Sequence, residues 1–196
     1  DVGNVIHVQP DIATIQSNSA GYGLYATDGG VIHSNAGNVS TSGSSAAGLF
    51  AAEPGSIIYW QGTNITTSGF RGRGIDTVRG GQVFGYGSVI TTGERAHAIQ
   101  AGDTNATAGP TRVTLEPGTS VHTFGNSSYG LHAYATGTVV GTVNIITEGV
   151  SSFGAHAEKD SSIDIYNSTI ETHGLNAIGL LANTDAITPG VNYTPG

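Results

Sequence analysis

The chain has 196 residues, of which 10% are charged, with a formal net charge of −8 and neither cysteine nor methionine. The acidic balance argues against nucleic-acid binding, which depends on lysine and arginine. The length fits one domain, and a chain without cysteine uses no disulfide. No apolar run reaches the roughly 18 residues of a membrane-spanning helix.

The first residues already carry short alternating stretches, Val5–Val8 and Ile12–Thr14. Residues 12–14 are a degenerate form of a phrase that returns later, and residues 31–33 follow a glycine pair as a further short strand. We therefore expect residues 1–16 to be either an N-terminal cap or the first coil of a repeat structure.

From residue 39 onward, one phrase organises the chain. The phrase begins with aliphatic-x-Thr-x-Gly. A second glycine or alanine follows five residues after the first glycine. After this second marker, an aliphatic residue and a small residue are expected to face inward. The first glycines of the six copies are Gly43, Gly69, Gly93, Gly125, Gly149 and Gly174. A long fixed period of this kind is typical of a solenoid.

Within each copy the residue types alternate, which indicates strands because successive side chains leave opposite faces of an extended chain. A single copy cannot bury a core, whereas stacked copies can, with parallel strands about 4.8 Å apart. We predict an all-β fold, a right-handed parallel β-helix of about seven coils of roughly 25 residues each. The β-helix is expected over residues 1–185, and residues 186–196 are expected to be a tail that leads to a further C-terminal part.

One spacing is longer than the others, between Gly93 and Gly125. The additional residues are placed most simply at 102–110, which include Asp103 and Asn105. In a solenoid, insertions of this kind form loops on one face, often the binding face, although a neutral loop is also tolerated.

All five arginines lie between residues 71 and 112, beside only three carboxylates. The corner of each copy is the segment between its first glycine and the second marker residue. Aligning the corner 69–74 with the corner 93–98 places Arg95 over Arg71 and His97 over Arg73. Stacked like charges are unfavourable unless an anion offsets them, so this corner is the predicted binding surface for an anionic partner. In the alternative, Glu94 and Asp76 pair with the arginines, or the arginines extend into water. The predicted ligand-binding residues are Arg71, Arg73, Arg95, His97, Tyr129, Phe153, Asp103 and Asn105.

The histidines and carboxylates give weaker signals. His132 and His156 occupy the same slot of neighbouring copies, but the slot holds no third ligand, so we expect a polar ladder, no metal and no cofactor. The carboxylates share no repeat slot, and the densest group, around Glu158 and Asp160, is expected to be a solvated turn. No Gly-Asp-Ser-Gly motif is present. We therefore expect no enzymatic activity.

The phrase Ile-x-Thr-x-Gly-x4-Gly-Leu-x-Ala, seen around Gly174, in a chain without cysteine resembles the passenger domain of a Gram-negative autotransporter of the pertactin-like group. The resemblance covers residues 12–182. It implies a virulence-associated, adhesin-like protein at the bacterial cell surface or secreted, natively linked to an outer-membrane β-barrel. It also implies that the partner is a host cell-surface receptor, glycan or matrix protein. We expect the chain itself to be a monomeric rod.

Three alternatives to this adhesin hypothesis remain open. A released passenger that acts as a ligand for one host receptor and triggers signalling is the first. A glycan-active enzyme is the second, and it is disfavoured by the scattered carboxylates. The third is a stalk that displays another domain, because repeats alone guarantee no site.

Overall fold

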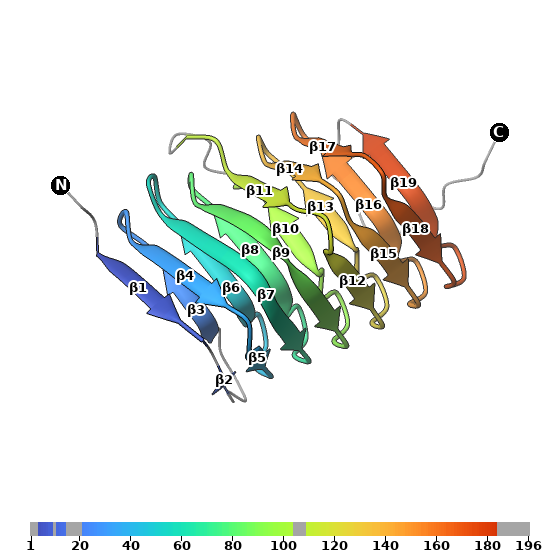
Figure 1. Cartoon of the computed structure of the whole chain (residues 1–196). Coiled ribbons are helices and arrows are strands. Elements are labelled where there is room, and N and C mark those ends of the chain that lie inside the picture. Colours follow the sequence, from blue (N-terminus) through green and yellow to red (C-terminus); the bar gives the residue numbers. More distant parts are fainter. Residues whose placement is uncertain (1–3, 10, 15–20, 104–108, 184–196) are drawn as a thin grey trace.

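The computed structural model of the chain describes residues 4–9, 11–14, 21–103 and 109–183, and for residues 11–14 the backbone alone. Within these ranges the regular structure consists of strands, and every strand pair is parallel (Figure 1). No described segment forms an apolar helix long enough to cross a membrane. The prediction of an all-β fold with parallel ladders is confirmed.

The strands belong to two sheets. The seven-stranded sheet contains one strand from each turn of the solenoid. Its members, in chain order, are β3 (Tyr22–Ala26), β6 (Ala47–Ala52), β8 (Arg73–Val78), β10 (Ile99–Ala101), β13 (Leu131–Ala133), β16 (Phe153–Glu158) and β19 (Ile178–Asn183).

The twelve-stranded sheet contains two runs that join at two long strands, β7 (Ile57–Thr67) and β9 (Gln82–Thr91). The first run adds β1 (Val5–Val8), β4 (Val31–Asn35), β11 (Arg112–Leu115), β14 (Thr138–Gly141) and β17 (Ser162–Ile165). The second run adds β2 (Asp11–Thr14), β5 (Asn38–Thr41), β12 (Ser120–Thr123), β15 (Asn144–Thr147) and β18 (Thr169–Thr172).

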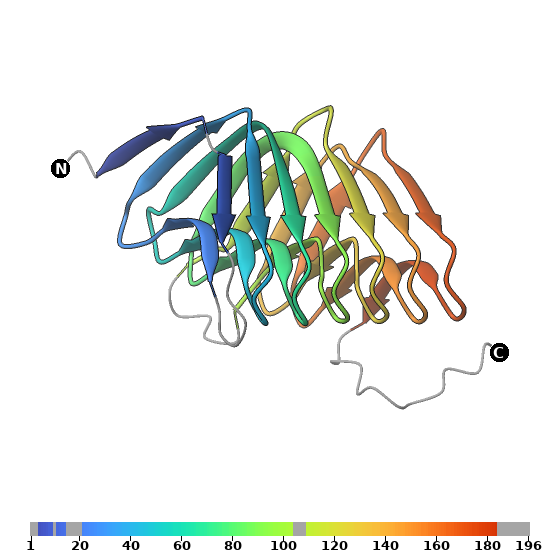
Figure 2. The same cartoon turned by 90° about the horizontal axis from the view of Figure 1, so that it is seen from below.

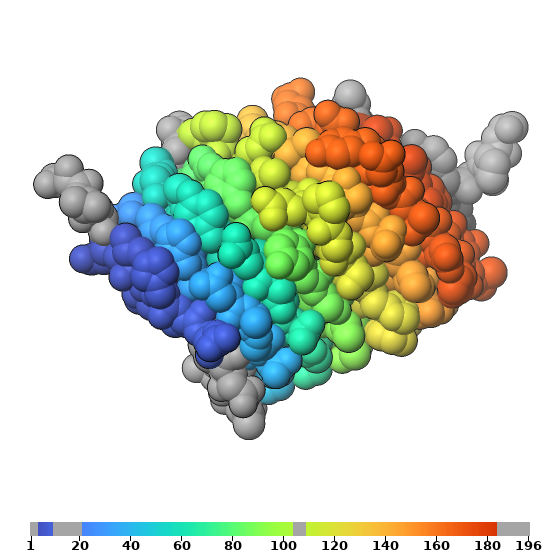
Figure 3. Space-filling model, in the orientation of Figure 1, coloured from blue at the N-terminus to red at the C-terminus, as the bar shows by residue number. Residues whose placement is uncertain are grey.

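Each turn therefore has three strand segments, and each turn repeats the outline of the turn before it (Figure 2). In the space-filling view the turns appear as diagonal bands that follow the sequence from one end of the rod to the other (Figure 3). Strand β1 pairs with β4 and strand β2 pairs with β5, so the described part of the N-terminal stretch stacks in register on the next turn. The predicted tail, 186–196, lies outside the described residues.

Buried columns of aliphatic side chains fill the space between the sheets. Val39, Ile65 and Val89 lie in one column, and all three are at most 1% exposed. The threonine of the repeated phrase also points inward, and in two copies its hydroxyl caps the corner: Thr67 Oγ1 donates to the carbonyl oxygen of Gly72 at 3.1 Å, and Thr91 Oγ1 to that of Ala96 at 2.8 Å. The equivalent hydroxyls of Thr41 and Thr147 are buried without a hydrogen-bond partner among the described residues, so this bond is not common to all copies.

The interior also holds the single tryptophan, which the repeat does not predict. Trp60 is fully buried, and its indole Nε1 donates to the carbonyl oxygen of Thr63 at 2.7 Å. In the next turn a Cβ at position 87 would lie 2.9 Å from the Trp60 ring. Glycine at position 87 therefore makes room for a large side chain in a narrow interior.

Candidate functional site

The corner that leads into the seven-stranded sheet is built by backbone contacts between turns. A Cβ at Gly93 would overlap the carbonyl oxygen of Gly69, so the first glycine of each phrase lets successive corners approach closely. The residue two positions later has a left-handed backbone, with φ near 55° in Arg71 and Arg95. Its N–H donates to the next turn, as from Arg71 to the carbonyl oxygen of Glu94 at 2.9 Å. The positions that share this conformation are Ser45, Arg71, Arg95, Ser127, Ser151 and Asn176, and we call them the corner column.

The two arginines of the corner column lie one turn apart, as the repeat predicts. The Arg71 side chain is exposed, and its guanidinium carbon lies 5.2 Å from the centre of the Phe70 ring. Among the described residues it has no ion pair. The Arg95 side chain is 41% exposed, and its Nε lies 3.9 Å from a Glu94 oxygen, a distance too long for a good hydrogen bond. The corner column therefore presents two guanidinium groups that are largely available to a ligand.

The other four predicted corner residues, Arg73, His97, Tyr129 and Phe153, lie on the outer face of the seven-stranded sheet. The hydrogen bonds confirm their alignment, because Ala98 N donates to Tyr129 O and Gly130 N to Phe153 O, both at 2.9 Å. Phe153 is only 8% exposed. The structure thus divides the predicted set into an exposed pair and a packed group.

The rings of the packed group cover one another. Tyr129 stacks on His97 with ring centres 4.4 Å apart and on Phe153 with ring centres 4.7 Å apart. Since both faces of the Tyr129 ring are already in contact, a sugar ring cannot stack on it. A similar stack of His7, His33, Tyr59 and Phe84 follows the outer face of the twelve-stranded sheet.

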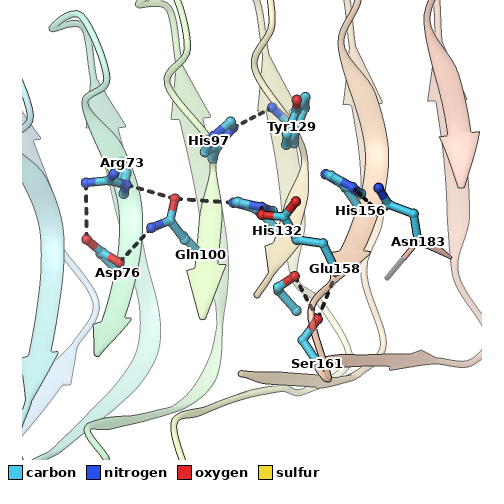
Figure 4. A network of polar contacts seen from close by, with 11 residues as sticks. Arg73, Asp76, His97, Gln100, Tyr129, His132, His156, Glu158, Ser161 and Asn183 are labelled. Carbon is cyan, nitrogen blue, oxygen red and sulfur yellow. Dashed lines mark hydrogen bonds and ion pairs between the residues drawn. The ribbon is translucent and has the colours of Figure 1, made fainter. Parts of the chain in front are cut away.

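A polar network runs beside these rings, across several turns of the seven-stranded sheet (Figure 4). Arg73 Nη1 lies 3.3 Å from a carboxylate oxygen of Asp76, and Arg73 Nε donates to Gln100 Oε1 at 2.9 Å. Gln100 Oε1 also lies 3.4 Å from His132 Nδ1, and His132 Nε2 lies 3.3 Å from a Glu158 oxygen. The alternative in which Asp76 pairs with an arginine therefore holds for Arg73.

Burial controls the protonation of the groups in and beside this network. It raises the pKa of Asp76, against the opposing effect of Arg73, and raises that of Tyr134 to about 12. Burial lowers the pKa of His97 well below its ordinary value and lowers that of His132. His97 is therefore uncharged at neutral pH, so it does not stack a second positive charge over Arg73.

The structure corrects the expectation for Glu158. The sequence predicts a solvated turn, but the Glu158 side chain is only 11% exposed and lies against His132. The contact with His132 is the main cause that lowers the pKa of Glu158. His132, His156 and Glu158 are the described residues whose ligand atoms gather closely enough to hold a metal ion, within 4.8 Å of one another. The sequence analysis compared only equivalent positions of successive copies. It therefore missed Glu158, which lies two residues after His156 on the same strand.

The predicted insertion falls between β10 and β11. Asp103, at its start, is partly buried, and Asn105 lies outside the described residues. Their predicted binding role stays a prediction.

Compared with known proteins, the chain matches no family model, no curated protein and no solved structure.

Proposed function

We propose that this chain is the binding segment of an exported bacterial surface protein, similar to an autotransporter passenger. In this proposal the corner column binds anionic molecules of host cells, and sulfated or sialylated glycans are the leading class. The observation that carries the proposal is the pair of guanidinium groups at Arg71 and Arg95. They project from neighbouring turns of a rigid backbone, and among the described residues Arg71 has no ion pair.

The chemistry of arginine favours an oxyanion ligand. The guanidinium group offers several N–H donors in a planar fork that matches sulfate or carboxylate oxygens. Neighbouring turns are about 4.8 Å apart, so two arginines of one column can contact the same anionic group or two adjacent ones. The exposed Phe70 ring beside Arg71 adds an apolar edge to this surface.

The acidic character of the whole chain does not oppose this binding at physiological salt. Charges further apart than about 8 Å are largely screened there. The affinity for an anionic ligand therefore depends mainly on the charges close to the corner column. The segment 71–112 carries five arginines against Asp76, Glu94 and Asp103, a local charge of +2. Of these carboxylates, Asp76 is already paired with Arg73.

The test uses heparin as a sulfated glycan and measures its affinity for the folded chain over a series of salt concentrations. We expect Arg71→Ala combined with Arg95→Ala to weaken binding about tenfold or more, because a charge-assisted hydrogen bond contributes at least about 1.5 kcal/mol. Arg112→Ala is the matched control. Arg112 is also exposed, but it lies on β11 of the other sheet and donates to Thr114, so heparin affinity should stay within about twofold.

Two results would contradict the proposal. Heparin affinity that is the same in the double variant and the wild type would remove the corner column from binding. Saturable binding to host cells that depends neither on the salt concentration nor on the double substitution would contradict it too. That result would favour the hypothesis that the chain is a ligand of one specific host receptor.

A further inference from the structure

A group of three potential metal ligands lies on the outer face of the seven-stranded sheet, at β13 and β16, away from the corner column. His132 and His156 occupy paired positions on these strands, with ring centres 5.4 Å apart and an angle of 16° between the rings. Glu158 comes from the end of β16. One ligand atom from each residue lies within 4.8 Å of the other two, and Figure 4 shows the three side chains beside one another.

The hydrogen bonds around His132 leave a mismatch that a cation would resolve. Arg73 only donates hydrogen bonds, so its contact with Gln100 fixes the Gln100 oxygen as an acceptor. The same oxygen faces His132 Nδ1 at 3.4 Å, and a carboxylate oxygen of Glu158 faces His132 Nε2 at 3.3 Å. A neutral imidazole has one N–H, so it cannot donate to both oxygens. When Nδ1 carries the proton, the lone pair of Nε2 faces the carboxylate.

His156 has one nitrogen without a partner. Its Nε2 lies 2.9 Å from Asn183 Oδ1, which assigns the ring proton to Nε2. Its Nδ1 is buried and has no hydrogen-bond partner among the described residues, although the whole residue is only 2% exposed. Buried nitrogen atoms are nearly always satisfied, so this free lone pair is a second and independent indication of a missing ligand.

We infer that His132, His156 and Glu158 bind a divalent transition-metal ion, with Zn²⁺ as the first choice. Two imidazoles and a carboxylate are a ligand set that Zn²⁺ accepts, with a fourth position left for water. Tetrahedral Zn²⁺ separates its ligand atoms by about 3.4 Å, and the distance between His132 Nε2 and Glu158 is already close to this value. Rotation of the His156 side chain would bring in the third ligand.

The surroundings of the group support metal binding. Gln100 would accept a hydrogen bond from the second nitrogen of His132 and so hold the ring in place, an arrangement usual around metal-bound histidine. The edges of His132 and His156 pack against the Tyr129 ring at 79° and 85°, which provides an apolar wall. The side chains of His132 and Glu158 keep 12% and 11% exposure, which leaves a narrow path to solvent.

The alternative is a simple ion pair between protonated His132 and Glu158. A protonated ring would donate to both Gln100 and Glu158 and would account for His132. It would leave Nδ1 of His156 without a partner. Metal binding accounts for both histidines.

The experiment is a calorimetric titration of the chelator-treated chain with Zn²⁺ near neutral pH, together with thermal melts with and without the metal. We expect one equivalent of Zn²⁺ to bind and to raise Tm, because a metal that binds only the folded state stabilises it. His156→Ala should weaken Zn²⁺ affinity more than about 100-fold, since loss of an outer-shell partner alone costs about 10–100-fold. Glu158→Gln keeps the size of the side chain and should weaken binding by a similar factor, so a folding defect in one variant does not decide the test.

The matched control is His122→Ala. His122 Nε2 also contacts a glutamate, Glu148, at 3.0 Å, but this pair lies on the twelve-stranded sheet and is more exposed. Zn²⁺ affinity should not change in this variant. The inference would be overturned if the chain did not bind Zn²⁺. It would also be overturned if His122→Ala abolished Zn²⁺ binding while Glu158→Gln left it unchanged. Heparin affinity should be the same in Glu158→Gln and the wild type, so the metal site and the corner column can fail separately.

Discussion

Arg71 and Arg73 are two residues apart in the sequence, yet they belong to different kinds of surface. Arg71 lies in the corner column, where contacts between main-chain atoms hold the turns together and the side chain is exposed. Arg73 begins β8, where Asp76 and Gln100 hold its side chain in a network. Main-chain contacts, together with the hydroxyls of Ser128 and Ser152, build the corner, whereas side chains build the network around Arg73 on the outer face of the sheet. Substitutions of the exposed corner arginines should therefore affect ligands, and substitutions that break the Arg73 network should affect the fold.

The largest effect is expected where a side chain is added to the backbone of the corner. Gly93→Ala places a methyl group against the carbonyl oxygen of Gly69, and we expect the free energy of unfolding to fall by about 3 kcal/mol in urea denaturation. The control is Gly179→Ala, where a Cβ would have no atom of the described residues within 4 Å. Equal stability of the two variants would show that the corners do not depend on close approach.

A smaller loss is expected when the network of the sheet face is broken. Asp76→Ala leaves Arg73 without its carboxylate, and because Arg73 is 27% exposed we expect a cost of about 2 kcal/mol, below the usual range for a buried pair. Glu94→Ala removes the carboxylate beside Arg95 at the corner and should change the stability by less than about 0.5 kcal/mol. Urea denaturation of the two variants measures the contrast directly, and similar losses in both would contradict it.

Removing both corner arginines should leave the fold intact. For Arg71→Ala combined with Arg95→Ala, we expect the free energy of unfolding to stay within about 0.5 kcal/mol of the wild type, since the substitutions touch only exposed side chains and relieve repulsion between like charges. The same urea measurement checks this result. A loss as large as that of Asp76→Ala would mean that the corner column is structural.

The smallest effect is expected for an exposed counterpart of the buried His132 and Glu158 pair. His173 Nδ1 lies 2.9 Å from Glu148 on the twelve-stranded sheet. The hydrogen bond with Glu148 raises the pKa of His173, and the hydrogen bond with His173 is the largest cause that lowers the pKa of Glu148. The contribution of His173 is present below its ordinary pKa of 6.5 and is lost as the pH rises through its raised value. The contribution of Glu148 is present above 4.5 and is lost as the pH falls through its lowered value.

Glu148→Gln should therefore lower Tm slightly near pH 5.5 and leave it unchanged near pH 9. Thermal melts at the two pH values measure the difference, which is small because exposed pairs are screened by solvent. A larger effect at the higher pH would contradict the assigned direction.

The period of the sequence predicts which residues stack on one another. The pairs Arg71 with Arg95 and His132 with His156 follow from the spacing of the glycines, because each turn repeats the backbone of the last. The threonine and aliphatic positions predict the core in the same way. These features depend on local alternation and on a fixed register, and both can be read from one chain.

The period does not predict how outward side chains pack among themselves. Phe50 faces outward but is covered by the Tyr22 and Tyr25 rings. Glu158 turns toward His132 instead of into water, because the neighbouring columns form one crowded surface. Side-chain conformations and contacts between columns decide these outcomes, and a repeat pattern holds no information about them. For the same reason the sequence favoured a polar ladder at His132 and His156, without a third metal ligand.

The most direct test of the corner column is an NMR titration of the folded chain with a heparin oligosaccharide, followed through the backbone amides. We expect the largest shift changes at residues 69–72 and 93–96, with loss of these changes in the Arg71→Ala and Arg95→Ala double variant. Shift changes centred on the strands of the seven-stranded sheet or around Arg112, or no changes at all, would contradict the account.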